Sequence, residues 1–417
     1  MKSQRAIDIA NEILELLKLN ESCDIYERQI NELVDKLQNR EITISVIGQF
    51  KRGKSTLSNA ILGEDVMPVG IVPITSAVTK AIYGEKSAEI RFKNREIKPV
   101  DFSDLHLYVS EQENNNNRLQ VHDVTVKLKS DFLKDGVVYV DTPGVGSFHE
   151  NNTNTAYDYI KESDAVMFLL SVDSPINQIE IELLKNTTEF AGKFYFIANK
   201  AETVSEDDLK AYIDYCKSLI SELMKIAEVK IFPVSAKEKM GIDELKKEIM
   251  QDISAEKIDI MEISAKRKMI DIIRSVQTQL KIYWKAMNME YTDLDKKFNR
   301  ISELISEIQR EAPENNSHFQ IRLNETKQRV SDEISKVFEI KYDMPTLYIE
   351  THNENMSKKD FLREVDKMCK ETRESLSKLL LYREEDAYVV VRKLEDANKI
   401  ERNLFSIENR LKRQLEN

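Results

Sequence analysis

Hydrophobic positions divide the chain into a central part with strand patterns and flanking parts with helix patterns. Between about residues 40 and 250, short runs rich in Val, Ile and other apolar residues alternate with polar, glycine-marked or proline-marked segments. Continuous apolar runs are typical of strands buried on both faces, as in a parallel sheet. The runs that predict strands cover residues 42–47, 77–83, 88–93, 121–128, 136–141, 165–171, 193–198 and 229–234. We expect an α/β domain with a mixed, mostly parallel sheet.

The flanking parts repeat apolar residues at helical spacing. Residues 3–39 predict two amphipathic helices, with one stripe through Ile13 and Leu17 and a second through Ile30 and Leu37. Isolated amphipathic helices are marginal in water, so these two need a partner surface.

A longer seam runs through the C-terminal half. From Met269 to Ile308, apolar residues recur at steps of three and four, with two successive steps of four between Tyr283 and Tyr291. This is a heptad seam with one stutter. We expect one helix from about 256 to 310, roughly 80 Å long at about 1.5 Å per residue. Further helices are predicted over residues 323–338, 357–380 and 390–415.

These patterns predict three parts of the chain. We expect residues 254–417 to form an elongated antiparallel helical bundle, and residues 1–39 to pack against it. The sheet domain, residues 40–253, would then be an insertion into that bundle.

One short segment interrupts the helical pattern, and two interpretations of it stay open. Met344–Ile349 is apolar enough to be a tip that touches a membrane, or it folds back onto the bundle as a loop. Acidic residues at Asp343, Glu350 and Glu354 favour the loop, because anionic lipid usually attracts lysine clusters.

Composition narrows the functional class. A net charge of −11 argues against a nucleic-acid binder, which usually presents a basic face. Cys23, Cys216 and Cys369 have neither metal-site nor disulfide spacing, which favours a reducing compartment. The N-terminus has no apolar signal core, and no apolar run reaches the roughly 18 residues that a membrane span needs. We therefore expect a cytoplasmic protein, with attachment to a membrane surface left open.

The strongest chemical motif lies between the first predicted strand and a helix. Gly48–Ser55 fits G-x-x-x-x-G-K-S, the phosphate-binding loop, in which glycines let backbone N–H groups reach phosphate oxygens. We expect Lys54 to bind the β- and γ-phosphates and the Ser55 hydroxyl to ligate Mg²⁺. The alternative is a chance glycine-rich turn, which the combination of strand, helix, lysine and serine disfavours. The predicted nucleotide contacts of the loop are Gly48, Gln49, Phe50, Lys51, Arg52, Gly53, Lys54, Ser55 and Thr56.

Two further segments predict contacts around the γ-phosphate. Thr75, in a loop before a strand, is a candidate first-switch residue near Mg²⁺; an ordinary threonine before a strand is the alternative. Asp141 ends a strand and can hold Mg²⁺ through water, while Gly144 can offer its N–H to the γ-phosphate. Val145–Asn154 would form a second switch. The predicted catalytic residues are Lys51, Lys54, Ser55, Thr75 and Gly144, and the predicted metal ligands are Ser55, Thr75 and Asp141.

Two later strand ends predict recognition of guanine. Asn199–Glu202 resembles the guanine-reading N-K-x-D motif, with glutamate in place of aspartate. A carboxylate in this position accepts the N1–H and N2–H of guanine, a donor pair that adenine lacks. Ser235–Lys237 follows the next strand and predicts a second loop beside the base. The predicted base-side contacts are Asn199, Lys200, Glu202, Ser235, Ala236 and Lys237, and the predicted cofactors are GTP or GDP with Mg²⁺.

The order and wording of these motifs resemble the dynamin superfamily, in particular bacterial dynamin-like GTPases. The segments that carry the resemblance are Gly48–Thr56, Pro73–Thr79, Asp141–Ser147 and Asn199–Glu202. The resemblance implies GTP hydrolysis, helices that move with the nucleotide state, homodimerisation through the GTPase domains, and action at membranes. Two other functions stay open: a soluble regulatory GTPase whose helices bind a protein partner, and a scaffold that binds GTP with little hydrolysis.

Lys51 is a candidate for the positive charge that GTP hydrolysis needs at the phosphates. Ras-like enzymes orient the attacking water with a glutamine just after D-x-x-G, where this chain has Val145. Lys51 stands where relatives often have serine or asparagine. We hypothesise that Lys51 supplies the charge that relatives obtain from a monovalent cation, and that dimerisation presses it into place. The alternative is that Lys51 is exposed and only tunes nucleotide affinity. If Lys51 does not supply the charge, Arg52 or His149 is the next candidate.

Overall fold

Contacts divide the chain into two compact units. The structure is a computed structural model, and it describes residues 2–20, 23–67, 78–92, 96–109, 113–114, 119, 121–142, 144, 159–310, 319–339, 365, 370 and 387–416. One unit, here called the sheet unit, comprises Met1–Ala6 and Asp35–Lys268; the other, the helical unit, comprises Ile7–Val34 and Met269–Asn417.

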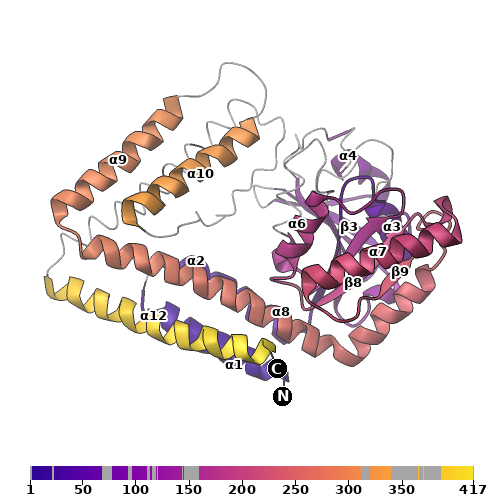
Figure 1. Ribbon diagram of the computed structural model, residues 1–417, viewed down its shortest axis with the longest axis horizontal. Helices are drawn as coiled ribbons and strands as arrows, with labels where there is room; N and C mark the ends of the chain where they lie inside the picture. Colours follow the sequence, from indigo (N-terminus) through magenta and orange to yellow (C-terminus); the bar gives the residue numbers. More distant parts are fainter. Residues whose placement is uncertain are drawn as a thin grey trace. The chain divides into compact units, whose positions relative to one another are not determined.

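The sheet unit is built on a nine-stranded sheet in the described part of the chain (Figure 1). Its strands are β1 (Ile42–Ile47), β2 (Val78–Tyr83), β3 (Ser87–Phe92), β4 (Ile97–Val100), β5 (Val121–Leu128), β6 (Val137–Asp141), β7 (Ala165–Ser171), β8 (Lys193–Asn199) and β9 (Ile231–Pro233). They lie in the order β4-β3-β5-β2-β6-β1-β7-β8-β9. All six residues of β1, which lies between β6 and β7, are buried.

Strand directions confirm the predicted mixed sheet. The run β6-β1-β7-β8-β9 is parallel throughout. Beyond it, β2 is antiparallel to β6 and parallel to β5, and β3 is antiparallel to both of its neighbours. Strand β4 was not predicted from the sequence. It is a short edge strand with exposed residues and a proline, so it lacks the apolar run that marks a buried strand.

Helices of the sheet unit cover the sheet. They include η2 (Phe102–Asp104), α4 (His106–Val109), η4 (Asp131–Leu133), α3 (Lys54–Leu62), α6 (Gln178–Thr187), η5 (Ala201–Thr203) and α7 (Glu206–Met224), with the first part of α8 (Ile242–Met287). Alternate side chains of β7, such as Phe168 and Leu170, share a core with Leu183 of α6 and Ile220 of α7. Helix α8 runs close to the start of β8, since a Cβ on Gly192 would lie 2.3 Å from the Ile260 carbonyl oxygen.

The helical unit joins helices from both ends of the chain. Its other helices are α1 (Lys2–Leu17), α2 (Asp24–Asn39), α9 (Tyr291–Arg310), α10 (Phe319–Phe338) and α12 (Ala387–Glu416). Helix α12 lies beside both α8 and α1 (Figure 1), where Glu408 pairs with Arg274 at 3.1 Å and Arg410 pairs with Glu12. The apolar stripes predicted from the sequence supply buried side chains, among them Ile13, Leu17, Ile30, Val276, Leu280, Leu404 and Leu411.

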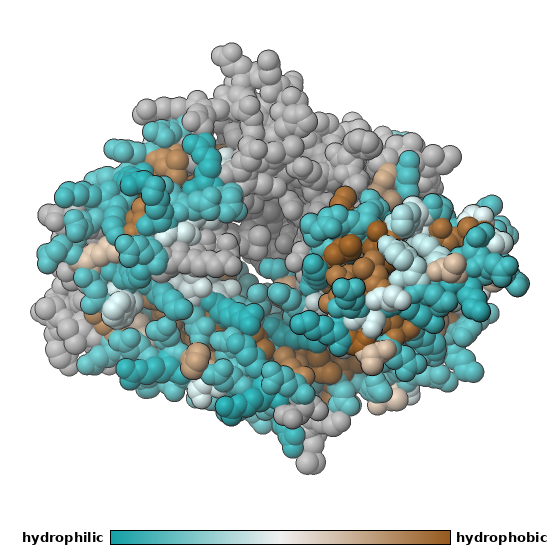
Figure 2. All heavy atoms as spheres, in the orientation of Figure 1, coloured by the Kyte–Doolittle hydropathy of each residue, from teal (hydrophilic) through white to brown (hydrophobic). Residues whose placement is uncertain are grey.

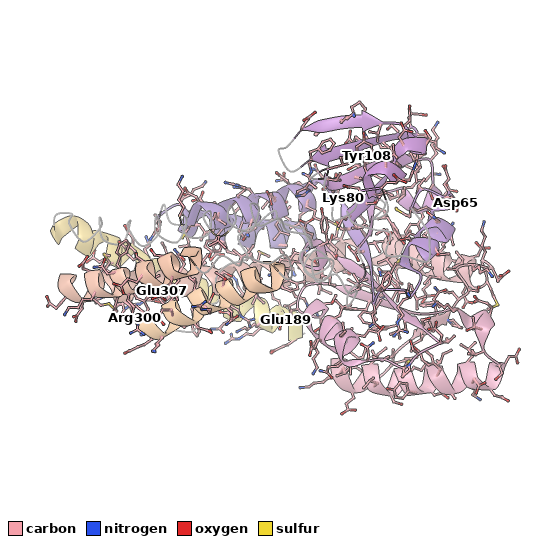
Figure 3. All side chains as sticks on the ribbon, turned by 90° about the horizontal axis from the view of Figure 1, so that it is seen from above. Asp65, Lys80, Tyr108, Glu189, Arg300 and Glu307 are labelled. Atoms are coloured by element: carbon pink, nitrogen blue, oxygen red, sulfur yellow. The ribbon has the colours of Figure 1, made fainter. Side chains whose placement is uncertain are left out.

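Helices α9 and α10 form an antiparallel pair. Lys297 of α9 donates to the Val337 carbonyl at 2.7 Å, and Arg300, the residue labelled in Figure 3, pairs with Glu333. The contacts advance along α9 while they move back along α10, which fixes the opposite directions of the two helices.

The predicted single helix from 256 to 310 is wrong. Helix α8 starts earlier, at Ile242, and ends at Met287, and α9 starts at Tyr291. The break lies within the predicted stutter. There Asn288 donates both its backbone N–H, at 3.1 Å, and its side-chain amide, at 2.8 Å, to the Trp284 carbonyl. An asparagine side chain that competes for a helical carbonyl favours a helix end. The stutter shifts the apolar positions around the helix, so continuing the helix at this point would no longer keep one apolar face.

Several predictions cannot be compared with the structure. The segments at Met344–Ile349 and 357–380 lie outside the described residues, apart from the buried Val365 and the helical Lys370. The predicted division into 1–39, 40–253 and 254–417 stays a prediction, although the compact units change over at 34/35 and 268/269.

Charged and polar side chains cover most of the described surface in Figure 2. Among the described helices, none has an apolar stretch long enough to cross a membrane.

Burial in the helical unit generates a stability prediction. Leu17 of α1 is fully buried, whereas nearby Leu19 is 42% exposed. Leu17→Ala removes core volume and should lower the free energy of unfolding by about 3 kcal/mol. Leu19→Ala, the matched control, should change it by less than about 0.5 kcal/mol. Thermal and denaturant unfolding followed by far-UV circular dichroism measures both, and equal losses would contradict the packing of α1.

Candidate nucleotide-binding site

The predicted phosphate loop connects β1 to α3, and its two glycines are required by close backbone approach. A Cβ on Gly48 would lie 2.6 Å from the Leu169 carbonyl oxygen of β7. A Cβ on Gly53, where φ is +92°, would lie 2.5 Å from the Asn199 side-chain nitrogen. Larger residues would force the loop away from the strands that flank it, so the glycines keep the loop at the carboxyl end of the sheet.

Lys54 closes this loop from inside. Its Nζ donates to the carbonyls of Gly48 at 3.1 Å and Gln49 at 3.2 Å, and the side chain is buried. Burial lowers the pKa of Lys54 to about 8, while the nearby charge of Asp141 acts in the opposite direction. The ammonium group is therefore mostly charged at neutral pH. Phosphate oxygens of a bound nucleotide would have to replace the loop carbonyls as its hydrogen-bond acceptors.

Asp141 brings the end of β6 to the start of α3. Its carboxylate accepts hydrogen bonds from the Ser55 hydroxyl at 2.9 Å and the Ser58 hydroxyl at 3.1 Å. Tyr139 supports Ser58 through a hydrogen bond of 3.0 Å between their hydroxyls. Burial raises the pKa of Asp141, with Lys54 and the two serines opposing that change.

The donor set at Asp141 and Ser55 fits Mg²⁺. A carboxylate and a hydroxyl are the hard oxygen ligands that this ion prefers, and one hydrogen bond already holds them side by side. Thr75, the third predicted ligand, lies outside the described residues.

Gly144 lies against the phosphate loop. A Cβ there would be 2.8 Å from the Phe50 Cα and 3.0 Å from the Lys54 Nζ. The Gly144 backbone therefore lies close to the Lys54 ammonium group, and its contact with the γ-phosphate stays a prediction. The second-switch segment Val145–Asn154, which includes His149, lies outside the described residues.

The predicted base-side loops meet the phosphate loop through Asn199. Its side-chain N–H₂ donates to the Arg52 carbonyl at 2.8 Å, and its side-chain oxygen accepts from the Ala236 N–H at 3.0 Å. One amide thus connects three segments that are distant in sequence. The Ser235 hydroxyl in turn accepts from the Glu238 N–H at 3.0 Å, which shapes the second base-side loop.

The remaining base-side residues surround this contact. Lys200 has a left-handed backbone, with φ of +64°, and its Nζ binds Asp173 at 2.7 Å. Glu202 lies exposed on η5, and Lys237 is also exposed. These positions leave the Glu202 carboxylate accessible to a ligand.

Two neighbouring cations of the phosphate loop are placed differently. Lys51 is exposed, with φ of +66°, and its Nζ lies 5.5 Å from the centre of the Phe50 ring. Arg52 is buried, and its guanidinium binds Glu180 of α6. The Arg52 side chain binds Glu180, so a contact between Arg52 and nucleotide would have to come from the Arg52 backbone.

Sequence reasoning missed Glu180, Asn177 and Ser58. Asn177-x-x-Glu180 before an apolar run is a capping-box signature and would have placed a helix start there. The pairing of Glu180 with the phosphate loop has no local signal.

Comparison with known proteins decides the family. The model of the Dynamin family matches residues 44–201, which contain the phosphate loop, Asp141 and Asn199. An uncharacterised protein in the xynA 3′ region of Caldicellulosiruptor sp. is 30% identical over 345 residues, which cover 79% of this chain and 84% of that protein. The chain belongs to the dynamin family. It is a bacterial dynamin-like GTPase, as the motifs predicted.

Named relatives are longer than this dynamin-like chain. Dynamin-like protein 2 of Campylobacter jejuni is 28% identical over 195 residues, 46% of this chain and 31% of its own. Dynamin-like protein A of Bacillus subtilis is 24% identical over 283 residues, 50% of this chain and 23% of its own. The match therefore covers less than two thirds of the length of these two relatives, whereas it covers 84% of the length of the Caldicellulosiruptor protein.

A solved structure of an oligomerised bacterial dynamin pair, described as sensing and tethering membranes over long range, is 18% identical. The match covers 97% of this chain and 79% of that chain, with a TM-score of 0.43. The family assignment rests on the sequence matches, and it confirms the predicted enzyme class, a GTP hydrolase.

The exposed Glu202 generates a prediction about the base. Glu202→Ala removes the acceptor for N1–H and N2–H, so GTP affinity should fall by about tenfold or more while ATP affinity stays the same. Glu202→Asp should preserve the preference for guanine. Competition binding with GTP and ATP measures this, and Glu206→Ala, an exposed glutamate in the first turn of α7, is the control. Equal affinity of the wild type for the two nucleotides would contradict the assignment.

Proposed function

We propose that this chain hydrolyses GTP, and that its nucleotide cycle drives dimerisation through the sheet unit and movement of helices in the helical unit. The observation that supports the proposal most is the convergence of Lys54, Asp141, Gly144 and Asn199 on one loop. The four residues come from three strand ends, because Asp141 and Gly144 both come from the end of β6. Each has the chemistry that one part of a guanine nucleotide needs.

The chain's own groups divide the work along the nucleotide. The Lys54 ammonium stabilises the negative charge that builds up on the β–γ bridge as the bond to the γ-phosphate breaks. Gly144 holds the γ-phosphate through its backbone N–H. Ser55 and Asp141 would hold Mg²⁺, which when bound would supply additional positive charge at the phosphates. Asn199 keeps the base-side loop fixed to the phosphate loop, and Glu202 selects guanine.

Lys51 completes the site in this proposal. The position after D-x-x-G is Val145, which can neither donate nor accept a hydrogen bond to water. Lys51 is the exposed cation of the loop, and its Nζ lies 5.5 Å from the centre of the Phe50 ring. Phe50 is in turn the residue against which Gly144 lies. Dimerisation of the sheet units would remove Lys51 from water and direct its charge to the bridging oxygen, where a cation gains strength from the lower dielectric.

Membrane action and partner binding belong to the same proposal. Membership of the dynamin family favours work at a membrane surface; the alternative is a regulatory GTPase whose helices bind a protein.

The first functional prediction concerns Lys54. Lys54→Ala should lower GTP turnover by at least about 100-fold, because it removes the charge that stabilises the transition state. Lys210→Ala, on the exposed face of α7, is the control. Steady-state phosphate release measures turnover, with and without liposomes of anionic lipid. Normal hydrolysis in Lys54→Ala would reject the assignment. If liposomes neither change turnover nor carry the protein into the pellet on sedimentation, the protein-partner alternative is favoured.

The second concerns Lys51. Turnover per molecule should rise with protein concentration in the wild type and should depend little on K⁺ versus Na⁺. Lys51→Ala should lower kcat by about tenfold or more and leave GDP affinity within about twofold, since the lysine acts on the transition state. Lys51→Ser should be slow and regain activity with K⁺. A wild-type rate in Lys51→Ala would place the charge elsewhere.

A further inference from the structure

A buried ion pair joins the phosphate loop to the start of α6. The Arg52 guanidinium donates from Nε to one Glu180 oxygen and from Nη2 to the other, each at 2.8 Å. The Arg52 side chain is 5% exposed and that of Glu180 is 0% exposed. This bidentate geometry fixes the plane of the guanidinium, which a single point charge would not do.

Glu180 is itself held rigidly. It is the third residue of α6 and forms a reciprocal capping box with Asn177. The Glu180 N–H donates to the Asn177 side-chain oxygen at 3.2 Å, and the Asn177 N–H donates to the Glu180 carboxylate at 3.2 Å. These two bonds hold the carboxylate against the first turn of α6, so it offers the loop a fixed anchor on the helix.

The same cluster holds a second loop side chain. The Gln49 side-chain oxygen accepts from Asn177 at 2.7 Å and from Arg52 Nη2 at 3.3 Å. Arg52 Nη1 also bonds the Ser174 hydroxyl. Two side chains of the loop, at either side of Phe50 and Lys51, are thus turned towards α6.

Other hydrogen bonds hold the backbone carbonyls of the same phosphate loop. The Arg52 carbonyl accepts from Asn199, and the carbonyls of Gly48 and Gln49 accept from Lys54. These bonds fix the backbone on the inner side of the loop, where an anion-binding loop presents its N–H groups to phosphate. The Arg52 N–H also helps to shape the loop, since it donates to the Gln49 carbonyl at 3.4 Å.

We propose that Glu180 is a positioning residue for nucleotide binding, which acts through Arg52 and Gln49 to hold the phosphate loop in its binding shape before nucleotide arrives. This inference rests on the proposed function, because it concerns the same loop. Preorganisation of this kind lowers the conformational cost of binding and so raises affinity for any nucleotide that carries α- and β-phosphates. Glu180 does not touch the reacting atoms, so its effect belongs in binding and not in the chemical step.

The test compares two glutamates in ion pairs. Glu180→Gln should weaken GDP binding by about tenfold and raise the KM for GTP by a similar factor, with kcat within about twofold. Glu262→Gln is the matched control, because Glu262 pairs with Lys266 at 2.7 Å, both side chains being 10% exposed, within α8. That control should leave GDP affinity within about twofold. Calorimetric titration with GDP below the melting temperature of each variant measures affinity in folded protein.

A double variant separates positioning from simple charge balance. Glu180→Gln alone leaves the buried Arg52 with the half-exposed Asp173, at 3.7 Å, as its remaining carboxylate partner among the described residues, which lowers stability. Arg52→Gln with Glu180→Gln removes both charges and should recover much of the melting temperature, while GDP affinity stays low. Recovery of GDP affinity in the double variant, or unchanged affinity in Glu180→Gln, would overturn the inference. If Glu180→Gln does not fold, the double variant alone decides. Failure of the wild type to bind GDP would instead reject the proposed function.

Discussion

The position of β1 between β6 and β7 is the constraint on which the site depends. The three strands are parallel, so their carboxyl ends lie at one edge of the sheet. The register sets Val46 beside Asp141, and Ile47 beside Phe168. Once β1 is buried in this place, the loop that follows it must start next to Asp141. The hydrogen bonds from Ser55 and Ser58 then need only local geometry. Burial of an apolar strand thus places the polar groups that carry the chemistry.

A second buried carboxylate holds the opposite end of the same strands. Asp164 precedes β7 and binds Lys36 at 2.7 Å and Lys268 at 2.9 Å, while it accepts from the Thr43 N–H and the Ser264 hydroxyl, each at 2.9 Å. Burial alone would raise the pKa of Asp164, but the two lysines lower it to about 2. Both lysines belong to the sheet unit, within a few residues of the points where the chain passes to the helical unit. Asp164 at this end of the sheet and Glu180 beside the phosphate loop are thus each paired with a cation, which is the condition under which buried ions are tolerated.

What could be predicted from the sequence follows the same physics. The central strands were predictable because burial on both faces demands apolar residues throughout, as in β7, where every residue is buried. Edge strand β4 lacks that demand and was missed. The helix break at Asn288 was missed because a single capping side chain overrides a seam that otherwise continues. In the site, Lys54 and Asp141 follow from motif spacing, since they lie at strand ends. The partner of Arg52 does not, because Glu180 reaches it only through the packing of α6 on the sheet.

Lys51 and Arg52 show how burial, not charge alone, assigns roles to neighbouring residues. Arg52 has five donor hydrogens, and a buried guanidinium needs partners for them, which the α6 cluster supplies. Lys51 has no such requirement, since its ammonium group stays in water. Its backbone is the unusual part: a non-glycine residue with φ of +66° costs about 1 kcal/mol or more. A glycine there would relieve that cost, but it would remove the exposed cation of the phosphate loop. Arg52 and Gln49, which flank this position, are both hydrogen-bonded to the cluster around Glu180, and these bonds oppose relaxation of the strained backbone between them.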